Sequence, residues 1–124
     1  MYLDADGNVI QGLSLSGHLA SGVPGSVDGM VEVHKKFGKL AWATLLQPAI
    51  DLAEKGVVLT VKEATGLNRI KNDLKKLNTD TTYFRRPDGK DWVEGDLLVQ
   101  KDLGQTLRRI QQKGRAGFYE GETA

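Results

Sequence analysis

The sequence predicts a mainly α-helical chain. Four stretches of the 124 residues repeat apolar side chains at spacings of three and four, which places those side chains on one face of a helix. Glycines or capping residues lie at the ends of these stretches, where a helix begins or stops. Hydrophobic residues make up 40% of the chain and charged residues 27%, with a formal net charge of +1, which is typical of a folded globular protein.

The chain has the length of one domain, or of part of a larger one. It divides into four parts by composition and periodicity. These are a Gly/Ser-rich ordered loop over residues 1–25, a helical part over 26–77, an irregular connection over 78–97 and a second helical part over 98–124.

The first helix is expected over residues 27–37. Its apolar face holds Val27, Met30, Val31, His34 and Phe37. Gly25 or Ser26 is the expected N-cap and Gly38 the residue after the last turn. Gly29 inside this helix costs about 1 kcal/mol relative to alanine, a cost that a close helix crossing would offset.

A second apolar face runs from Trp42 to Ala53 and ends at Gly56. Pro48 lies inside it and lacks the amide that a helix interior needs. We therefore expect either a short helical turn before Pro48 or a break with Pro48 near the first position of a new helix, and we place the helix over 48–55.

The third helix is expected over residues 61–77. Thr60 and Glu63 form a capping box, in which each side chain bonds the backbone of the other residue. The opposite face is basic and is expected to be solvated, with Glu63 and Asp73 partly offsetting its charge. Its cations are Lys62, Arg69, Lys71, Lys75 and Lys76.

The last helix is expected over residues 101–113 and ends at Gly114. Phe118 and Tyr119 begin a further element. In the connection before this helix, Tyr83, Phe84 and Trp92 are the expected packing anchors.

Metal and nucleophile sites find little support in the residues. The chain has no cysteine, and its two histidines, His18 and His34, have no partner at a zinc-binding spacing. Residues 4–8, DADGN, begin like a calcium loop but lack the later ligands and the closing glutamate, so we expect a surface turn.

Residues 17–29, GHLASGVPGSVDG, concentrate four glycines around Pro24 just before the first helix. They match neither a phosphate-binding P-loop nor a dinucleotide-binding loop. Free amides at a helix N-terminus can hold an anion. The alternative is geometric: Pro24 fixes one φ angle and the glycines set the backbone path into the helix.

Two classes of partner are disfavoured by composition. A nucleic-acid binder usually has a clear excess of basic residues, which a net charge of +1 does not provide. No apolar run approaches the roughly 20 residues of a membrane span, and the first residues lack the pattern of a signal peptide.

Three stretches together resemble a known family. GHLASGVPGSVDGM, LLQPAIDLAEKG and LVQKDLGQTLRRI, followed by FYEG, resemble the large subunit of the γ-glutamyltranspeptidases, which are also called γ-glutamyltransferases or glutathione hydrolases. The resemblance covers nearly the whole chain in order, and its most specific pieces are residues 20–29, 47–56 and 96–121.

The resemblance implies that the chain is a partial domain, the helical part of the large subunit of an αββα N-terminal-nucleophile hydrolase. In this family the precursor cuts itself into two subunits, and the new N-terminal threonine of the small subunit attacks the γ-glutamyl amide. The remainder of the large subunit and the small subunit are the implied partners, and no metal or organic cofactor is implied. The implied location of the parent enzyme is periplasmic or extracellular.

The family's substrate-binding arginine lies just before the stretch that matches residue 1, and its threonine nucleophile lies far beyond residue 124. We therefore expect no catalytic, cofactor-binding or metal-binding residue within this chain, and no activity from it alone. Thr81 and Thr82 resemble the family's Thr-Thr-His signature, but Tyr83 replaces the histidine, so we expect a loop there.

Two alternatives remain at this point. One is a stand-alone helical interaction module that binds an acidic partner through the basic face over 62–76 or through Arg108 and Arg109. The other is a relative that processes cephalosporins or poly-γ-glutamate. A helical piece of a larger fold is also expected to expose apolar surface and to self-associate.

Overall fold

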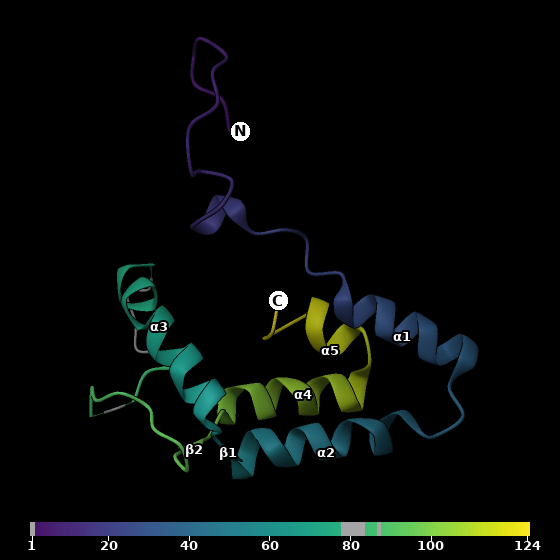
Figure 1. The fold of residues 1–124 in the computed structure, drawn as a ribbon. Helices are drawn as coiled ribbons and strands as arrows, with labels where there is room; N and C mark the ends of the chain where they lie inside the picture. Colours follow the sequence, from purple (N-terminus) through teal and green to yellow (C-terminus); the bar gives the residue numbers. More distant parts are fainter. Residues whose placement is uncertain (1, 78–83, 87) are drawn as a thin grey trace.

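A computed structural model describes residues 2–77, 84–86 and 88–124 (Figure 1). The described part is mainly helical, which confirms the predicted class. The elements in chain order are the 3-10 turn η1 (His18–Ala20), α1 (Ser26–Phe37), α2 (Trp42–Lys55), β1 (Val57–Val58), α3 (Val61–Leu77), β2 (Leu97–Leu98), α4 (Lys101–Lys113) and α5 (Ala116–Tyr119).

The body of the fold is the pair of helices α2 and α4, which lie side by side and antiparallel (Figure 1). At one end, the indole nitrogen of Trp42 donates to the carbonyl of Ile110 over 3.0 Å. At the other end, Gly104 lets α4 approach Glu54 so closely that a Cβ at this position would lie 2.6 Å from Cγ of Glu54. Ile50 of α2 is fully buried and belongs to the apolar core of this helix pair.

The predicted break at Pro48 is wrong, because α2 runs unbroken from Trp42 to Lys55 with Pro48 inside it. A proline there removes one backbone hydrogen bond, at a cost of about 3 kcal/mol in an isolated helix. Tertiary packing overrides this preference: Ile50 and Ala53, in the half of α2 that follows Pro48, are both buried.

A two-stranded antiparallel ribbon joins the two halves of the chain, with Val57 opposite Leu98 and Val58 opposite Leu97. These short strands were not predicted. Gly56, which ends α2, has a φ of 95°, a conformation that favours glycine. A Cβ at Gly56 would also lie 2.7 Å from Cγ of Leu97, so the same glycine permits the ribbon to form.

The third helix begins as predicted. The Thr60 amide donates to the Glu63 carboxylate over 2.8 Å, and the Glu63 amide points back to the Thr60 hydroxyl at 3.4 Å. Behind this start lies a small core of Leu59, Ala64 and Trp92. The prediction for Trp92 as a packing anchor is confirmed.

Trp92 is held at both its backbone groups by one side chain. The Asn68 amide donates to the Trp92 carbonyl and accepts from the Trp92 amide, each over 2.8 Å. The carbonyl of Phe84 accepts the indole N–H of Trp92. Phe84 itself is 40% exposed, so its predicted role as a packing anchor is wrong. Tyr83 lies outside the described residues.

Gly38 directly follows α1, as predicted. Its φ of −65° lies outside the left-handed region, and its lack of a side chain makes room for the ring of His34. The close helix crossing expected at Gly29 is not made by the described residues, because none of their atoms lies within 4 Å of the place that a Cβ would take.

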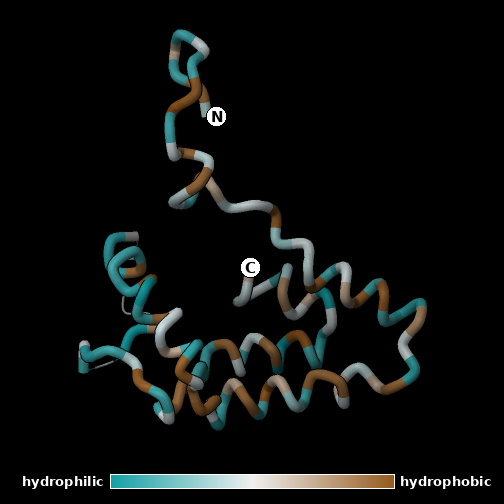
Figure 2. The backbone as a smooth tube through the Cα atoms, in the orientation of Figure 1, coloured by the Kyte–Doolittle hydropathy of each residue, from teal (hydrophilic) through white to brown (hydrophobic). Residues whose placement is uncertain are grey.

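Residues before α1 form an arm that projects away from the helical body and carries both polar and apolar residues (Figures 1 and 2). At its tip, Leu3 bridges to Val9, and the Asp4 carboxylate accepts the amides of Asp6 and Asn8 over 3.0 and 2.8 Å. These bonds lower the pKa of Asp4, the backbone bond from Asn8 most of all. The predicted surface turn is confirmed.

Among the described residues, no helix combines the length and apolar character needed to cross a bilayer.

Candidate functional site

An apolar groove with a volume of about 910 Å³ lies between α1, α2 and α4. We call it the α1 groove. No Asp, Glu, Lys or Arg lines it, and its one ionisable lining residue is His34. Two contacts fix the ring of His34. Its Nε2 lies 2.9 Å from the carbonyl oxygen of Leu40, and the ring packs edge-on against the ring of Trp42, with 5.1 Å between the ring centres. The groove therefore suits an apolar occupant.

Large apolar side chains stand exposed along the α1 side of this groove. Met30 is 56% exposed, Val33 61% and Phe37 68%. Folded monomers seldom leave a contiguous apolar surface of this kind uncovered unless it binds something. The predicted exposure of apolar surface is thus present in the structure.

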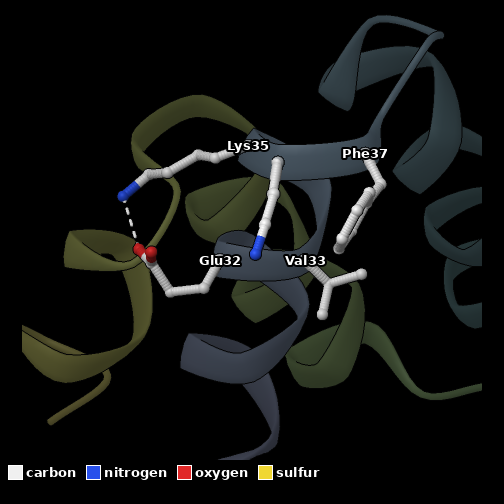
Figure 3. Close-up of a pocket in the computed structure, with 5 residues that line it drawn as sticks. Glu32, Val33, Lys35 and Phe37 are labelled. Atoms are coloured by element: carbon white, nitrogen blue, oxygen red, sulfur yellow. Dashed lines mark hydrogen bonds and ion pairs between the residues drawn. The ribbon is translucent and has the colours of Figure 1, made fainter.

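A shallower hollow of about 360 Å³ lies at the C-terminal end of α1 (Figure 3). Val33 and Phe37 lie together on one side of it, while Lys35 and Glu32 pair on the other over 2.6 Å. Both partners of this ion pair are mostly exposed to solvent, so the pair forms a charged edge opposite the apolar side chains of Val33 and Phe37.

Four residues fix the start of α1 against α5. The Tyr119 hydroxyl donates to the carbonyl of Pro24 and accepts the amide of Asp28 over 3.2 Å. Arg115 donates to the Asp28 carboxylate over 2.8 Å and lies over the Tyr119 ring, 4.8 Å from its centre. We call this set the α1 clamp.

The α1 clamp bears on the two interpretations of residues 17–29. An anion at this helix start would meet the carboxylate of Asp28 in the first turn, and one of the amides it would need is already bonded to Tyr119. The arrangement favours the geometric role, in which Pro24 and its glycine neighbours set the backbone path into α1.

The remaining candidates from the sequence are not brought together. His18 is exposed in η1 and does not line the α1 groove, whereas His34 does. Across residues 2–77, 84–86 and 88–124, no group of three or more His, Asp or Glu side chains is arranged to hold a metal ion. Thr81 and Thr82 lie outside the described residues.

Several cations proposed for an acidic partner are engaged within the chain. Arg108 forms a two-point contact with Glu54, with Nε and Nη2 at 2.5 and 2.6 Å from the carboxylate oxygens. This contact holds the pKa of Glu54 below its usual value. Arg109 donates to the Thr123 and Thr106 hydroxyls over 2.7 and 3.0 Å.

The basic face of α3 is also partly engaged. Lys71 donates to the carbonyl of Gly89 over 2.8 Å and pairs with Asp91 over 3.0 Å. Lys62, Arg69, Lys75 and Lys76 are exposed, as expected for a solvated face.

The residues of the α1 clamp were not predicted as a unit. Tyr119 lies 95 residues from Pro24 and Arg115 lies 87 residues from Asp28, so no local pattern connects them. The sequence offered only an indirect signal for the α1 clamp, namely that Arg115 and Tyr119 lie in a short segment just after Gly114, which ends α4.

The family model described as Gamma-glutamyltranspeptidase matches residues 1–124. Among curated proteins, the glutathione hydrolase proenzyme of Pseudomonas sp. (strain A14) is 45% identical over 124 residues, which is 100% of this chain and 22% of that relative. The chain therefore spans about a fifth of the length of the curated relatives it matches.

Two solved structures show how the same fold occurs in longer chains. The Helicobacter pylori gamma-glutamyltranspeptidase superposes with a TM-score of 0.92 at 43% identity, over 100% of this chain and 36% of that one. The Bacillus anthracis transpeptidase enzyme CapD superposes with a TM-score of 0.74 at 36% identity, over 87% of this chain and 37% of that one.

Proposed function

Since the chain belongs to the gamma-glutamyltranspeptidase family, we propose that it is a structural segment of an enzyme that cleaves γ-glutamyl amide bonds in glutathione and related compounds. The observation that carries the proposal is the match along the entire chain, at 45% identity to a glutathione hydrolase proenzyme and with a TM-score of 0.92 to a solved member. In this reading the segment supports the catalytic site and does not supply its reacting groups.

The chemistry we propose for the whole enzyme uses a threonine outside this chain, at the new N-terminus of the small subunit. Its α-amine takes the hydroxyl proton, and the hydroxyl oxygen attacks the γ-glutamyl carbonyl. Backbone amides stabilise the oxyanion, and the C–N bond breaks with a proton returned to the leaving amine. Water or an acceptor amine then takes the γ-glutamyl group from the threonine.

We further propose that residues 1–124 are one partial domain of an αββα enzyme, with an ordered loop over 1–25, helical parts over 26–77 and 98–124, and a connection over 78–97. The remainder of the large subunit and the small subunit are its partners, and the γ-glutamyl substrate binds outside it. The apolar α1 groove supports this assignment, because such a surface needs cover. For the whole enzyme we propose a periplasmic or extracellular location.

The alternatives are less well supported. The likeness to the Bacillus anthracis CapD is weaker than that to the Helicobacter pylori enzyme in both identity and TM-score. An acid-binding interaction module would have to rely on the exposed cations of α3, since Arg108 and Arg109 of α4 are bonded within the chain.

The test is an assay of the complete enzyme that carries residues 1–124, with γ-glutamyl-p-nitroanilide as substrate. We expect release of p-nitroaniline and, by mass spectrometry, a proenzyme cut into two subunits. The 124-residue chain alone serves as the matched control and is expected to show neither. A complete enzyme that leaves γ-glutamyl amides intact but cleaves another acyl compound would overturn the substrate assignment.

A further inference from the structure

We propose that α3 carries a docking surface for the anionic face of a lipid bilayer, formed by three exposed cations, Lys62, Arg69 and Lys76. We call this set the α3 row. The contact lies at the headgroups and involves no helix that crosses the bilayer. The proposal goes beyond the proposed function, because it uses none of the groups that cleave γ-glutamyl amides.

The spacing of the three cations aligns them along the helix. They are seven residues apart, which is close to two helical turns, so they lie nearly above one another over a length of about 21 Å. None of the three forms an ion pair or a hydrogen bond with another residue of the described chain. A straight row on one face of a helix lets all three cations meet a flat surface at the same time.

Other cations of this region are bonded inside the fold. Lys71 of α3 pairs with Asp91 over 3.0 Å. Arg86 pairs with Asp88 over 3.1 Å and also with Asp96. These contacts hold the connection that follows α3, so the fold accounts for the charges of Lys71 and Arg86. It does not account for the charges of the α3 row in the same way.

The charge of the chain is unevenly distributed. Residues 61–90 contain eight of the 17 Lys and Arg residues but four of the 16 Asp and Glu residues, so this stretch has a formal net charge of +4 and the remainder −3. In space, α3 runs from the β1–β2 ribbon to the outer edge of the fold, away from the α2–α4 body (Figure 1). An anionic surface therefore attracts the α3 side and repels the rest, which orients the chain with α3 toward that surface.

The side chains around the α3 row favour a bilayer surface over a folded protein as the partner. Thr65, Asn72 and Asp73 share the face of the row, whereas Ala64 packs on the other side of α3 in the small core with Trp92. Specific protein interfaces have an apolar centre, which this polar face does not offer. A layer of anionic headgroups needs only cations near its surface. Without large apolar side chains in the row, the helix adsorbs to the headgroups and does not insert.

The test is cosedimentation of the complete enzyme that carries residues 1–124 with lipid vesicles. We expect binding to vesicles of phosphatidylcholine with phosphatidylglycerol, and none to phosphatidylcholine alone. Neutralising the α3 row with Lys62→Gln, Arg69→Gln and Lys76→Gln together should lower the partition coefficient roughly 10- to 100-fold. The matched control removes the same charge from exposed lysines elsewhere and should lower it much less; it combines Lys36→Gln, Lys39→Gln and Lys113→Gln.

One substitution should strengthen the contact. Asp73 stands between Arg69 and Lys76 on the face of the α3 row, so Asp73→Asn removes a carboxylate that opposes binding. We expect it to raise the partition coefficient roughly fivefold, the effect of about one charge near an anionic surface. Binding should disappear in about 1 M salt, where the Debye length is about 3 Å.

Equal losses in the two triple variants would overturn the proposal, as would an enzyme that does not bind the anionic vesicles. Retention of soluble poly-L-glutamate by the α3 row without binding to vesicles would also overturn it, since the partner would then be an acidic polymer. The Tm of each variant verifies that it is folded. Activity on γ-glutamyl-p-nitroanilide is measured separately, and its absence would contradict the proposed function while leaving the vesicle result in place.

Discussion

Arg108 of α4 and Glu54 of α2 form a parallel two-point contact, with two nitrogens of the guanidinium 2.5 and 2.6 Å from the two carboxylate oxygens. The pair connects residues 54 positions apart and lies beside Gly104, which is itself close to the Glu54 side chain. Two-point arginine–carboxylate contacts are both stronger and more directional than single ones, so this pair fixes the direction in which α4 meets α2.

Glu54→Gln is expected to lower the Tm at pH 7 and to have a much smaller effect near pH 3. Arg108 holds the folded-state pKa of Glu54 below its ordinary value of 4.5, so the contribution is present above that value and is lost as the pH falls through the folded-state pKa. Thermal unfolding of both proteins from pH 7 to pH 3 measures the difference. The control is Glu32→Gln in the exposed Glu32–Lys35 pair, which should change little at either pH.

Tyr119→Phe is expected to loosen the start of α1 without unfolding the chain. The substitution removes the hydroxyl that bonds Pro24 and Asp28, while the ring under Arg115 stays. A net loss of about 1 kcal/mol is expected for such a hydrogen bond. Hydrogen exchange should become faster in the first turn of α1. Tyr2→Phe, which removes a bond to Leu19 within the arm, should leave that turn unaffected.

Thr60→Ala is expected to destabilise the chain by about 1 kcal/mol, because its hydroxyl no longer bonds the Glu63 amide or carboxylate. The Thr60 amide most of all, and the Thr60 hydroxyl after it, keep the pKa of Glu63 below its ordinary value. Only the hydroxyl bond is lost in Thr60→Ala, and the part of the effect that depends on the Glu63 charge should disappear in acid. Urea unfolding at two pH values measures both. Thr65→Ala is the matched control, since its hydroxyl bonds only the Val61 carbonyl in the interior of the helix. An equal loss in both variants would contradict the capping role.

Pro48→Ala is expected to raise the Tm, because alanine restores a backbone donor inside α2 and removes the clash of the proline ring. The gain has an upper limit of about 3 kcal/mol, the difference between the two residues in a helix interior. Differential scanning calorimetry of the isolated chain is the measurement. A lower Tm would mean that packing of α2 on α4 depends on the shape that proline imposes.

The fold was predictable where the signal was local. Helix spacing identified α1, α3 and α4 nearly to the residue, and the Thr60–Glu63 box identified the start of α3. The break predicted at Pro48 is absent because burial of the residues around it overrides the unfavourable effect of proline inside a helix. The β1–β2 ribbon has two residues per strand, too few for an alternating pattern to be seen.

The candidate site was less predictable for the same physical reason. The α1 groove exists only once α1, α2 and α4 are placed together, and its exposed Met30 and Phe37 look in the sequence like ordinary core residues. The α1 clamp joins residues about 90 positions apart, which no spacing rule relates. Sequence periodicity says which face of a helix is apolar, but not whether this chain or another covers it.

The last prediction concerns that uncovered face in the isolated chain. Phe37 and Val33 are more than half exposed and lie next to each other on α1. Association of two chains through these side chains would remove them from water and is therefore favourable. We expect the mean mass in light scattering to rise with concentration, and Val33→Lys with Phe37→Lys to suppress the rise without lowering the Tm. Leu19→Lys, an exposed apolar residue on the arm, is the matched control and should suppress it much less. An isolated chain that stays monomeric at high concentration would show that Val33 and Phe37 do not drive association.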